Sequence, residues 1–156
     1  MKKIKLLLVD DEENFVRTLA ERLEIRDLGP KVALSGEEAL DFLAKDTPDV
    51  IVLDLRMPGI DGMEVLRRVK QSRKPIQVII LTGHGTEKDK EEAMRIGAFE
   101  YHTKPVDIDA LVFSIKTAHR KKLEDMMVAA TFAQAGEMET AGQLLIDDGL
   151  ADKTGE

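Results

Sequence analysis

The sequence has no cysteine and no tryptophan, and only 4% of its 156 residues are aromatic. The absence of cysteine excludes disulfides and thiolate metal sites, and the few aromatics mean that aliphatic side chains must fill the core. Long apolar runs are also missing. The basic N-terminal segment is followed by only four apolar residues before Asp10, too few for a signal peptide, and no run approaches a membrane span. We therefore expect a single domain with an appendage, in the reducing cytoplasm and outside the membrane.

An excess of basic charge is absent as well. Residues 1–122 carry 22 basic and 22 acidic side chains, whereas residues 123–156 carry one lysine and eight acidic residues, so the net charge of −7 comes from this tail. An acidic tail repels the phosphate backbone, and direct binding of nucleic acid is therefore not expected. We divide the chain into a domain over 1–122 and an acidic helical extension over 123–156 with a flexible end.

Several short apolar segments end at a residue with a charged or polar side chain. Runs of leucine and β-branched residues, separated by amphipathic segments of helix length, are typical of buried strands in a parallel sheet. Ligands bind at the carboxyl ends of such strands, so the residues that follow them should share one edge. The segments and their end residues are Leu6–Val9 with Asp10 and Asp11, Val50–Leu53 with Asp54, Val78–Leu81 with Thr82, and Phe99–Thr103 with Lys104 and Pro105.

Strand and helix patterns alternate five times, which predicts an α/β fold: a doubly wound, five-stranded parallel sheet with helices on both faces. Helix-capping signals agree with this order, because Ser35 with Glu38, Asp61 with Glu64, and Thr86 can each begin a helix. Strands are expected at 4–9, 31–34, 49–53, 77–81 and 99–101, and helices at 13–25, 36–44, 62–72, 87–96 and from 108 onward.

The last helix is predicted to continue beyond the domain, because apolar residues keep a helical stripe without a breaker until Gly136. An exposed apolar stripe normally has a partner, so we expect this extension to form a homodimer or to dock a partner protein. A flexible acidic tail is the alternative. Gly136 is expected to end the helix, with a short helix over 138–146 and a flexible end from Asp147.

The predicted edge brings together three acidic side chains. Two like charges about 4 Å apart repel by roughly 4 kcal/mol at an effective dielectric of about 20, so Asp10, Asp11 and Asp54 need a cation. A hard divalent ion with oxygen ligands meets this need, and Mg²⁺ with its few protein ligands suits phosphoryl chemistry. Lys104 and Thr82 would then contact the oxygens of a transferred phosphoryl group.

With these residues in this order, the sequence resembles the receiver domain of two-component response regulators, a flavodoxin-like fold shared with the chemotaxis receiver. The resemblance covers about residues 4–120. It rests on the Asp10-Asp11 pair, the segment Leu53–Gly59 around Asp54, Thr82-Gly83 and Lys104-Pro105. It implies a phosphoacceptor switch of a phosphorelay, whose only catalysis is self-catalysed phosphotransfer and autodephosphorylation.

The resemblance implies that Asp54 accepts a phosphoryl group from a sensor histidine kinase or a phosphotransfer protein and becomes an aspartyl phosphate. Asp11 would be the main side-chain ligand of Mg²⁺, Asp10 would assist through water, and Asp54 would bind the ion directly. The backbone carbonyl of Arg56 would complete the protein ligands.

Three further residues would transmit the change. The resemblance implies that Lys104 contacts the phosphoryl oxygens, that Thr82 moves toward them, and that Tyr101 turns inward behind Thr82. The Lys104–Pro105 peptide bond would be cis. The output would be contact with a downstream protein that the sequence does not identify, and we expect no DNA-binding output domain.

Arg56 bears on two further expectations. By the resemblance, Arg56 and His84 stand two residues beyond Asp54 and Thr82, beside the path of the hydrolytic water, and their long side chains should slow dephosphorylation. The competing function is a phosphatase of the haloacid dehalogenase type, but such enzymes usually carry an aspartate at the position of Arg56 and place the nucleophile after the first strand. A nucleotide-binding fold is disfavoured because no glycine-rich phosphate loop is present.

Overall fold

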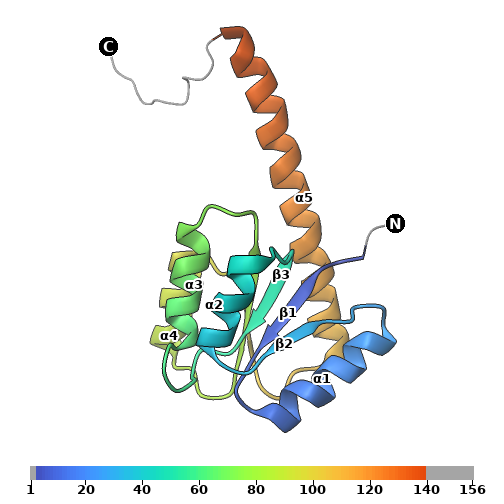
Figure 1. Ribbon diagram of the computed structural model, residues 1–156, viewed down its shortest axis with the longest axis vertical. Helices are drawn as coiled ribbons and strands as arrows, with labels where there is room; N and C mark the ends of the chain where they lie inside the picture. Colours follow the sequence, from blue (N-terminus) through green and yellow to red (C-terminus); the bar gives the residue numbers. More distant parts are fainter. Residues whose placement is uncertain (1–2, 140–156) are drawn as a thin grey trace. The chain divides into compact units, whose positions relative to one another are not determined.

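The computed structural model describes residues 3–139, with side chains for residues 3–135. The chain divides into two units, Met1–Lys122 and Leu123–Glu156. Strands and helices alternate as the sequence predicts (Figure 1). The elements are β1 (Leu6–Val9), α1 (Glu13–Ile25), β2 (Lys31–Ala33), α2 (Gly36–Lys45), β3 (Val50–Leu53), α3 (Gly62–Gln71), β4 (Gln77–Thr82), α4 (Glu87–Ile96), β5 (Glu100–Thr103) and α5 (Ile108–Glu139).

The five strands form one parallel sheet in the order β2-β1-β3-β4-β5. Every residue of β1 and β3 is buried, as expected for central strands that are covered on both faces. The strand β2 pairs with one edge of β1, and β3 pairs with the other edge. After β2 the chain therefore crosses to the opposite side of β1, where β3, β4 and β5 are added in sequence. The doubly wound α/β fold predicted from the sequence is confirmed.

Alternate residues of each strand enter two separate apolar cores, because successive side chains point to opposite faces of a sheet. On one face the strands pack against α2, α3 and α4, through Leu7, Ile51, Val65, Leu66 and Ala93 among others. On the other face they pack against α1 and α5, through Leu8, Val52, Val16, Leu111 and Ile115 among others.

The predicted helix caps are present. The Ser35 side chain accepts a hydrogen bond from the Glu38 N–H, and the Asp61 side chain accepts one from the Glu64 N–H. Thr86 forms a full capping box with Asp89. These caps fix the starts of α2, α3 and α4. The helices α3 and α4 follow β3 and β4, the strands that end at Asp54 and Thr82.

The predicted end of the last helix at Gly136 is wrong, because α5 continues to Glu139. A glycine inside a helix costs about 1 kcal/mol relative to alanine, which weakens a helix without ending it. The predicted short helix over 138–146 begins inside α5, and the rest of it, with the end from Asp147, lies outside the described residues. No helix in the described part is long and apolar enough to cross a membrane.

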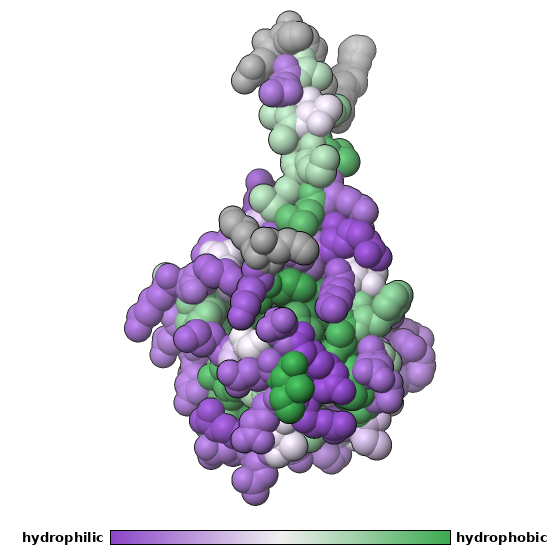
Figure 2. All heavy atoms as spheres, turned by 90° about the vertical axis from the view of Figure 1, so that its right-hand side faces the viewer, coloured by the Kyte–Doolittle hydropathy of each residue, from purple (hydrophilic) through white to green (hydrophobic). Residues whose placement is uncertain are grey.

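The surface of the second unit is largely apolar where its side chains are described (Figure 2). Large apolar side chains there are exposed: Leu123, Met126, Met127, Val128 and Phe132. No residue between Met126 and Ala135 is charged. A helix that is apolar on most of its circumference is normally covered by another surface.

Candidate functional site

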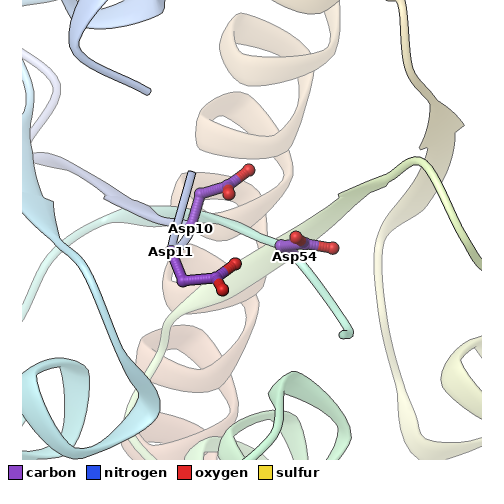
Figure 3. A group of neighbouring side chains, drawn as sticks. All are labelled: Asp10, Asp11 and Asp54. Carbon is purple, nitrogen blue, oxygen red and sulfur yellow. The ribbon is translucent and has the colours of Figure 1, made fainter. Parts of the chain in front are cut away.

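Three carboxylates gather at the carboxyl ends of β1 and β3 (Figure 3). Asp10 and Asp11 follow β1, Asp54 follows β3, and these two strands are paired neighbours. One carboxylate oxygen from each residue lies within 4.8 Å of those from the other two. Asp10 and Asp54 are buried and Asp11 is exposed, so the cluster is reached by solvent on the side of Asp11.

Local backbone geometry holds the two buried carboxylates. The Asp10 carboxylate accepts a hydrogen bond of 2.9 Å from the Glu12 N–H, and the Asp54 carboxylate accepts one of 3.3 Å from the Arg56 N–H. Gly62 allows the start of α3 to approach β3 closely, since a Cβ at this position would lie 2.0 Å from the Asp54 carbonyl oxygen. The start of α3 is therefore packed tightly against the backbone of Asp54.

Lys104, which follows β5, directs its ammonium group into the acidic cluster. Its Nζ lies 2.7 Å from Asp10 Oδ2, 2.6 Å from Glu12 Oε1 and 3.6 Å from Asp54 Oδ2. The same Nζ lies 4.3 Å from the centre of the Phe15 ring, within the range of a cation–π contact. Lys104 thus lies close to Asp54 but bonds to Asp10 and Glu12.

The pKa shifts of these groups follow from burial and from this bonding. Burial raises the pKa of the Asp10 carboxyl and outweighs its hydrogen bond from Lys104. Burial alone would lower the pKa of Lys104, but its hydrogen bonds to Asp10 and Glu12 raise it above the usual value. The hydrogen bond from Lys104 lowers the pKa of the Glu12 carboxyl. Lys104 therefore stays charged.

A single ammonium group faces more than one carboxylate, so negative charge remains in excess when the carboxyls are ionised. Oxygen donors alone make up the cluster of Asp10, Asp11 and Asp54. Hard divalent cations such as Mg²⁺ prefer this donor set, and the exposed side of the cluster leaves room for the waters that Mg²⁺ retains. The residues present therefore fit such an ion.

Thr82 and Tyr101 lie on the neighbouring strands β4 and β5. Thr82 is fully buried, and its hydroxyl accepts a hydrogen bond of 3.4 Å from the His84 N–H. The Tyr101 hydroxyl is buried and has no hydrogen-bond partner in the described part of the chain, and burial raises its pKa. Gly85 makes room for it, because a Cβ there would lie 1.8 Å from the Tyr101 hydroxyl oxygen. Tyr101 therefore points inward.

Two contacts at the site have no counterpart in the sequence expectations. Glu12 shares the Lys104 ammonium with Asp10, and Arg56 forms an ion pair with Asp89 in the first turn of α4. The only signal for Glu12 was that it extends the acidic pair before it. Asp89 gave no signal, because its distance from Arg56 depends on how two loops are folded.

The remaining predicted residues lie at the same edge of the sheet. The Lys104–Pro105 peptide bond is cis, as the resemblance implies. His84 is exposed in the loop between β4 and α4. The side chain of Arg56 is half exposed and reaches across toward α4. All the residues singled out from the sequence thus surround the ends of β1, β3, β4 and β5.

The sequence profile of the response regulator receiver domain matches residues 6–116. This chain belongs to the response regulator receiver domain family. Receiver domains act as phosphoacceptor switches in two-component systems, bind Mg²⁺ at an acidic pocket, and interact with histidine kinases or phosphotransfer proteins. The family predicted from the motif residues and their order in the sequence is confirmed. The receiver domain occupies most of the first unit.

Relatives and solved structures agree with this assignment. The uncharacterized transcriptional regulatory protein YkoG of Bacillus subtilis is 36% identical over 135 residues, which make up 85% of this chain and 59% of that protein. Sporulation initiation phosphotransferase F of the same organism is 36% identical over 112 residues, or 72% of this chain and 90% of that protein. A crystal structure of a receiver domain protein from Clostridium thermocellum has 39% identity and a TM-score of 0.69, and the match covers 77% of this chain and 98% of that one.

The chain spans little more than half the length of YkoG. The function of the whole YkoG protein therefore cannot be assigned to this receiver domain. The expected absence of a DNA-binding output domain stays a prediction.

Proposed function

We propose that this receiver domain accepts a phosphoryl group on Asp54 from a sensor histidine kinase or a phosphotransfer protein. The observation that supports the choice of Asp54 is its position: its carboxylate is buried at the end of β3, inside the acidic cluster, 3.6 Å from the Lys104 ammonium. Asp10 is bonded to Lys104 at 2.7 Å, and Asp11 is exposed. Asp54 thus has a buried carboxylate that lies close to the Lys104 ammonium, while that ammonium bonds more closely to Asp10.

The proposed cofactor is Mg²⁺. Asp11 would be its main side-chain ligand, Asp10 would act through a water molecule, and Asp54 and the backbone carbonyl of Arg56 would bind it directly. When bound, Mg²⁺ supplies positive charge that offsets the charge of the carboxylates and of the phosphoryl oxygens. We expect a chelator to abolish labelling of Asp54.

In the proposed transfer, an Asp54 carboxylate oxygen attacks the phosphorus of the donor. A P–O bond forms while the P–N bond of the donor phosphohistidine breaks, and the released imidazole nitrogen takes up a proton. The Lys104 ammonium would move from Asp10 toward the phosphoryl oxygens, and the Thr82 hydroxyl would donate to another of them. Attack of water on the same phosphorus later breaks the P–O bond to Asp54, which returns the carboxylate and releases inorganic phosphate.

We propose that Thr82 and Tyr101 carry the change to the surface formed by α4, β5 and α5. Tyr101 already points inward in this structure, with its hydroxyl against Gly85. Movement of Thr82 toward the phosphoryl group would therefore change how this buried ring is packed. The domain then signals by a phosphorylation-dependent contact with a downstream protein.

The donor would approach over an apolar groove beside the acidic cluster. The groove lies between α1 and the segment after β5, and its lining includes Phe15, Leu19, Pro105 and Val106. Because Phe15 also contacts the Lys104 ammonium, a donor seated there would lie next to the reacting groups. We expect Thr18→Glu, at an exposed position of the same lining, to slow transfer from the kinase while labelling by acetyl phosphate is unchanged.

The proposed role of the helical extension is contact with a second copy or with a partner protein. The exposed side chains of Met127 and Phe132 support this role. Replacing both with glutamate in the full chain should lower the sedimentation coefficient if the extension pairs with itself, or abolish partner binding if it docks another protein. No change in either property would remove this role.

We also propose that Arg56 and His84 prolong the phosphorylated state by shielding the acyl phosphate from water. The hydrogen bond of 3.3 Å from the Arg56 N–H to the Asp54 carboxylate supports this, since it places this long side chain next to Asp54. Arg56→Asn should hydrolyse its aspartyl phosphate faster than the wild type. Equal rates would contradict the shielding.

The experiment that tests the main proposal is incubation with acetyl phosphate and Mg²⁺ followed by mass measurement. The wild type should gain one base-labile phosphoryl group, Asp54→Asn should gain none, and Asp41→Asn on the exposed side of α2 should behave as the wild type. The competing phosphatase function predicts instead steady turnover of p-nitrophenyl phosphate. Arg56 at the position of the general acid argues against such turnover.

A further inference from the structure

An ion pair joins the loop after β3 to the first turn of α4. The Arg56 guanidinium donates to Asp89 Oδ2, although the two residues lie 33 positions apart in the sequence. The Asp89 side chain is mostly shielded, with 22% exposed, and that of Arg56 is about half exposed. Because it bridges the loop after β3 and the first turn of α4, this pair restricts how α4 can move relative to the loop.

Both residues of the pair make a second contact: Arg56 bonds to the proposed phosphoacceptor, and Asp89 bonds to the N-cap residue of α4. The Arg56 N–H donates to the Asp54 carboxylate at 3.3 Å, so Arg56 is anchored to the proposed phosphoacceptor. Asp89 Oδ2 also accepts the Thr86 N–H at 3.1 Å, and the Asp89 N–H donates to Thr86 Oγ1 at 3.0 Å. A single carboxylate oxygen thus serves the cap of α4 and the guanidinium of Arg56.

A phosphoryl group on Asp54 would compete for this guanidinium. It adds a charge of about −1.5 to −2 and three strong acceptor oxygens, next to a residue whose own backbone already contacts the Asp54 carboxylate. Arginine matches the geometry of phosphate oxygens by donating two parallel hydrogen bonds. The more highly charged group should therefore outcompete one shared oxygen of Asp89.

The unpartnered Tyr101 hydroxyl belongs to a residue next to α4, since the Tyr101 ring centre lies 5.9 Å from Lys90 Nζ. Burial, and after it the Asp89 charge, raise the pKa of Tyr101, and Tyr101 comes from β5, which packs against α4. A carboxylate released from Arg56 would leave negative charge near a buried O–H donor without an acceptor.

We propose that Arg56 and Asp89 couple Asp54 to α4: a phosphoryl group on Asp54 draws the Arg56 guanidinium away from Asp89 and loosens the first turn of α4. The coupling rests on the proposed function, since it requires phosphorylation of Asp54. Arg56 acts here as a positioning residue for α4, in addition to any shielding of the acyl phosphate.

The test is hydrogen exchange of the backbone amides over Glu87–Lys90 in the full chain, with Mg²⁺ alone and with Mg²⁺ and beryllofluoride as the phosphoryl mimic. Asp89→Asn removes the ion pair but keeps an oxygen that can accept the Thr86 N–H, so the cap of α4 is preserved. The matched control is Glu92→Gln, which removes the charge of another ion pair of α4, Arg67 to Glu92 at 2.8 Å, away from the acidic cluster.

We expect beryllofluoride to accelerate exchange in the wild type by about two- to five-fold, the range for an ion pair worth up to about 1 kcal/mol. Asp89→Asn should exchange at the faster rate without beryllofluoride and respond little to it, whereas Glu92→Gln should respond as the wild type does. A full response in Asp89→Asn, or an equal loss of response in Glu92→Gln, would overturn the coupling.

The two proposals fail in different ways. If acetyl phosphate labels Asp54 in the wild type but beryllofluoride leaves exchange in α4 unchanged, only the coupling is wrong. If neither acetyl phosphate nor beryllofluoride reacts at Asp54, the proposed function is wrong and the coupling falls with it. Arg56→Gln gives a second check, because without the guanidinium exchange in α4 should be as fast with Mg²⁺ alone as with beryllofluoride.

Discussion

Two buried hydroxyls at the α4, β5 and α5 side of the domain offer a direct comparison of bonded and unbonded polar groups. The Tyr101 hydroxyl has no hydrogen-bond partner among the described residues. The hydroxyl of Ser114, which is 2% exposed, donates to a Glu100 carboxylate oxygen and lies 2.8 Å from His102 Nε2. Removing these two hydroxyls should therefore change stability in opposite directions.

The expected magnitudes follow from the contacts. A buried polar group without a partner costs about 1–3 kcal/mol, so Tyr101→Phe should raise the free energy of unfolding by about 1 kcal/mol while the ring keeps its packing. A hydrogen bond to a charged group contributes about 1.5–3 kcal/mol, and Ser114→Ala should lower the free energy of unfolding by about 2 kcal/mol because Glu100 is partly exposed. The two variants should differ by about 3 kcal/mol.

Urea unfolding at pH 7 measures both changes, with equal slopes showing that the unfolded states are comparable. The single tyrosine and the lack of tryptophan make far-ultraviolet circular dichroism the suitable probe, since it does not depend on the replaced residue. The reasoning is refuted if Tyr101→Phe destabilises the protein by more than about 1 kcal/mol, the contribution of an ordinary hydrogen bond, because the hydroxyl would then have a partner.

Three further predictions concern other parts of the domain. Gly62→Ala would place a Cβ 2.0 Å from the Asp54 carbonyl oxygen and should cost about 1–3 kcal/mol in urea unfolding, whereas Gly29→Ala, whose nearest contact is 3.7 Å, should cost almost nothing. Burial would raise the pKa of Asp49, but its bonds from Lys122 and the Lys5 N–H lower it, so Asp49→Asn should cost about 2 kcal/mol at pH 7. This gap should shrink below about pH 4, where Asp49 becomes protonated in the unfolded chain before it does in the folded protein, and a gap that stays constant down to pH 3 would contradict it. Lys104→Arg should still be labelled by acetyl phosphate but should relay the signal poorly, and normal signalling in an assay with the cognate kinase and target would show that the position of this charge is unimportant.

The convergence of Asp10, Asp11 and Asp54 was predictable because it depends only on strand order. Each residue directly follows an apolar run, and parallel strands place their carboxyl ends at one edge. The helix starts at Ser35, Asp61 and Thr86 were predictable for a similar reason, since an N-cap is a local property of a few residues. These features need no knowledge of how distant loops are folded.

The contacts of the long side chains were not predictable. Glu12 bonds to Lys104, which lies 92 positions away, and Arg56 bonds to Asp89, which lies 33 positions away. Both contacts depend on where loops place flexible side chains after the sheet has formed. The predicted end of α5 at Gly136 is wrong because glycine alone weakens a helix by only about 1 kcal/mol, too little to end it.

The most direct test of the account is to locate the phosphoryl group. After incubation with acetyl phosphate and Mg²⁺, borohydride reduces an aspartyl phosphate to homoserine, and peptide sequencing by mass spectrometry then identifies the modified residue. The account predicts homoserine at position 54 alone, and only when Mg²⁺ is present. Homoserine at position 10 or 11, or none at any position, would contradict it.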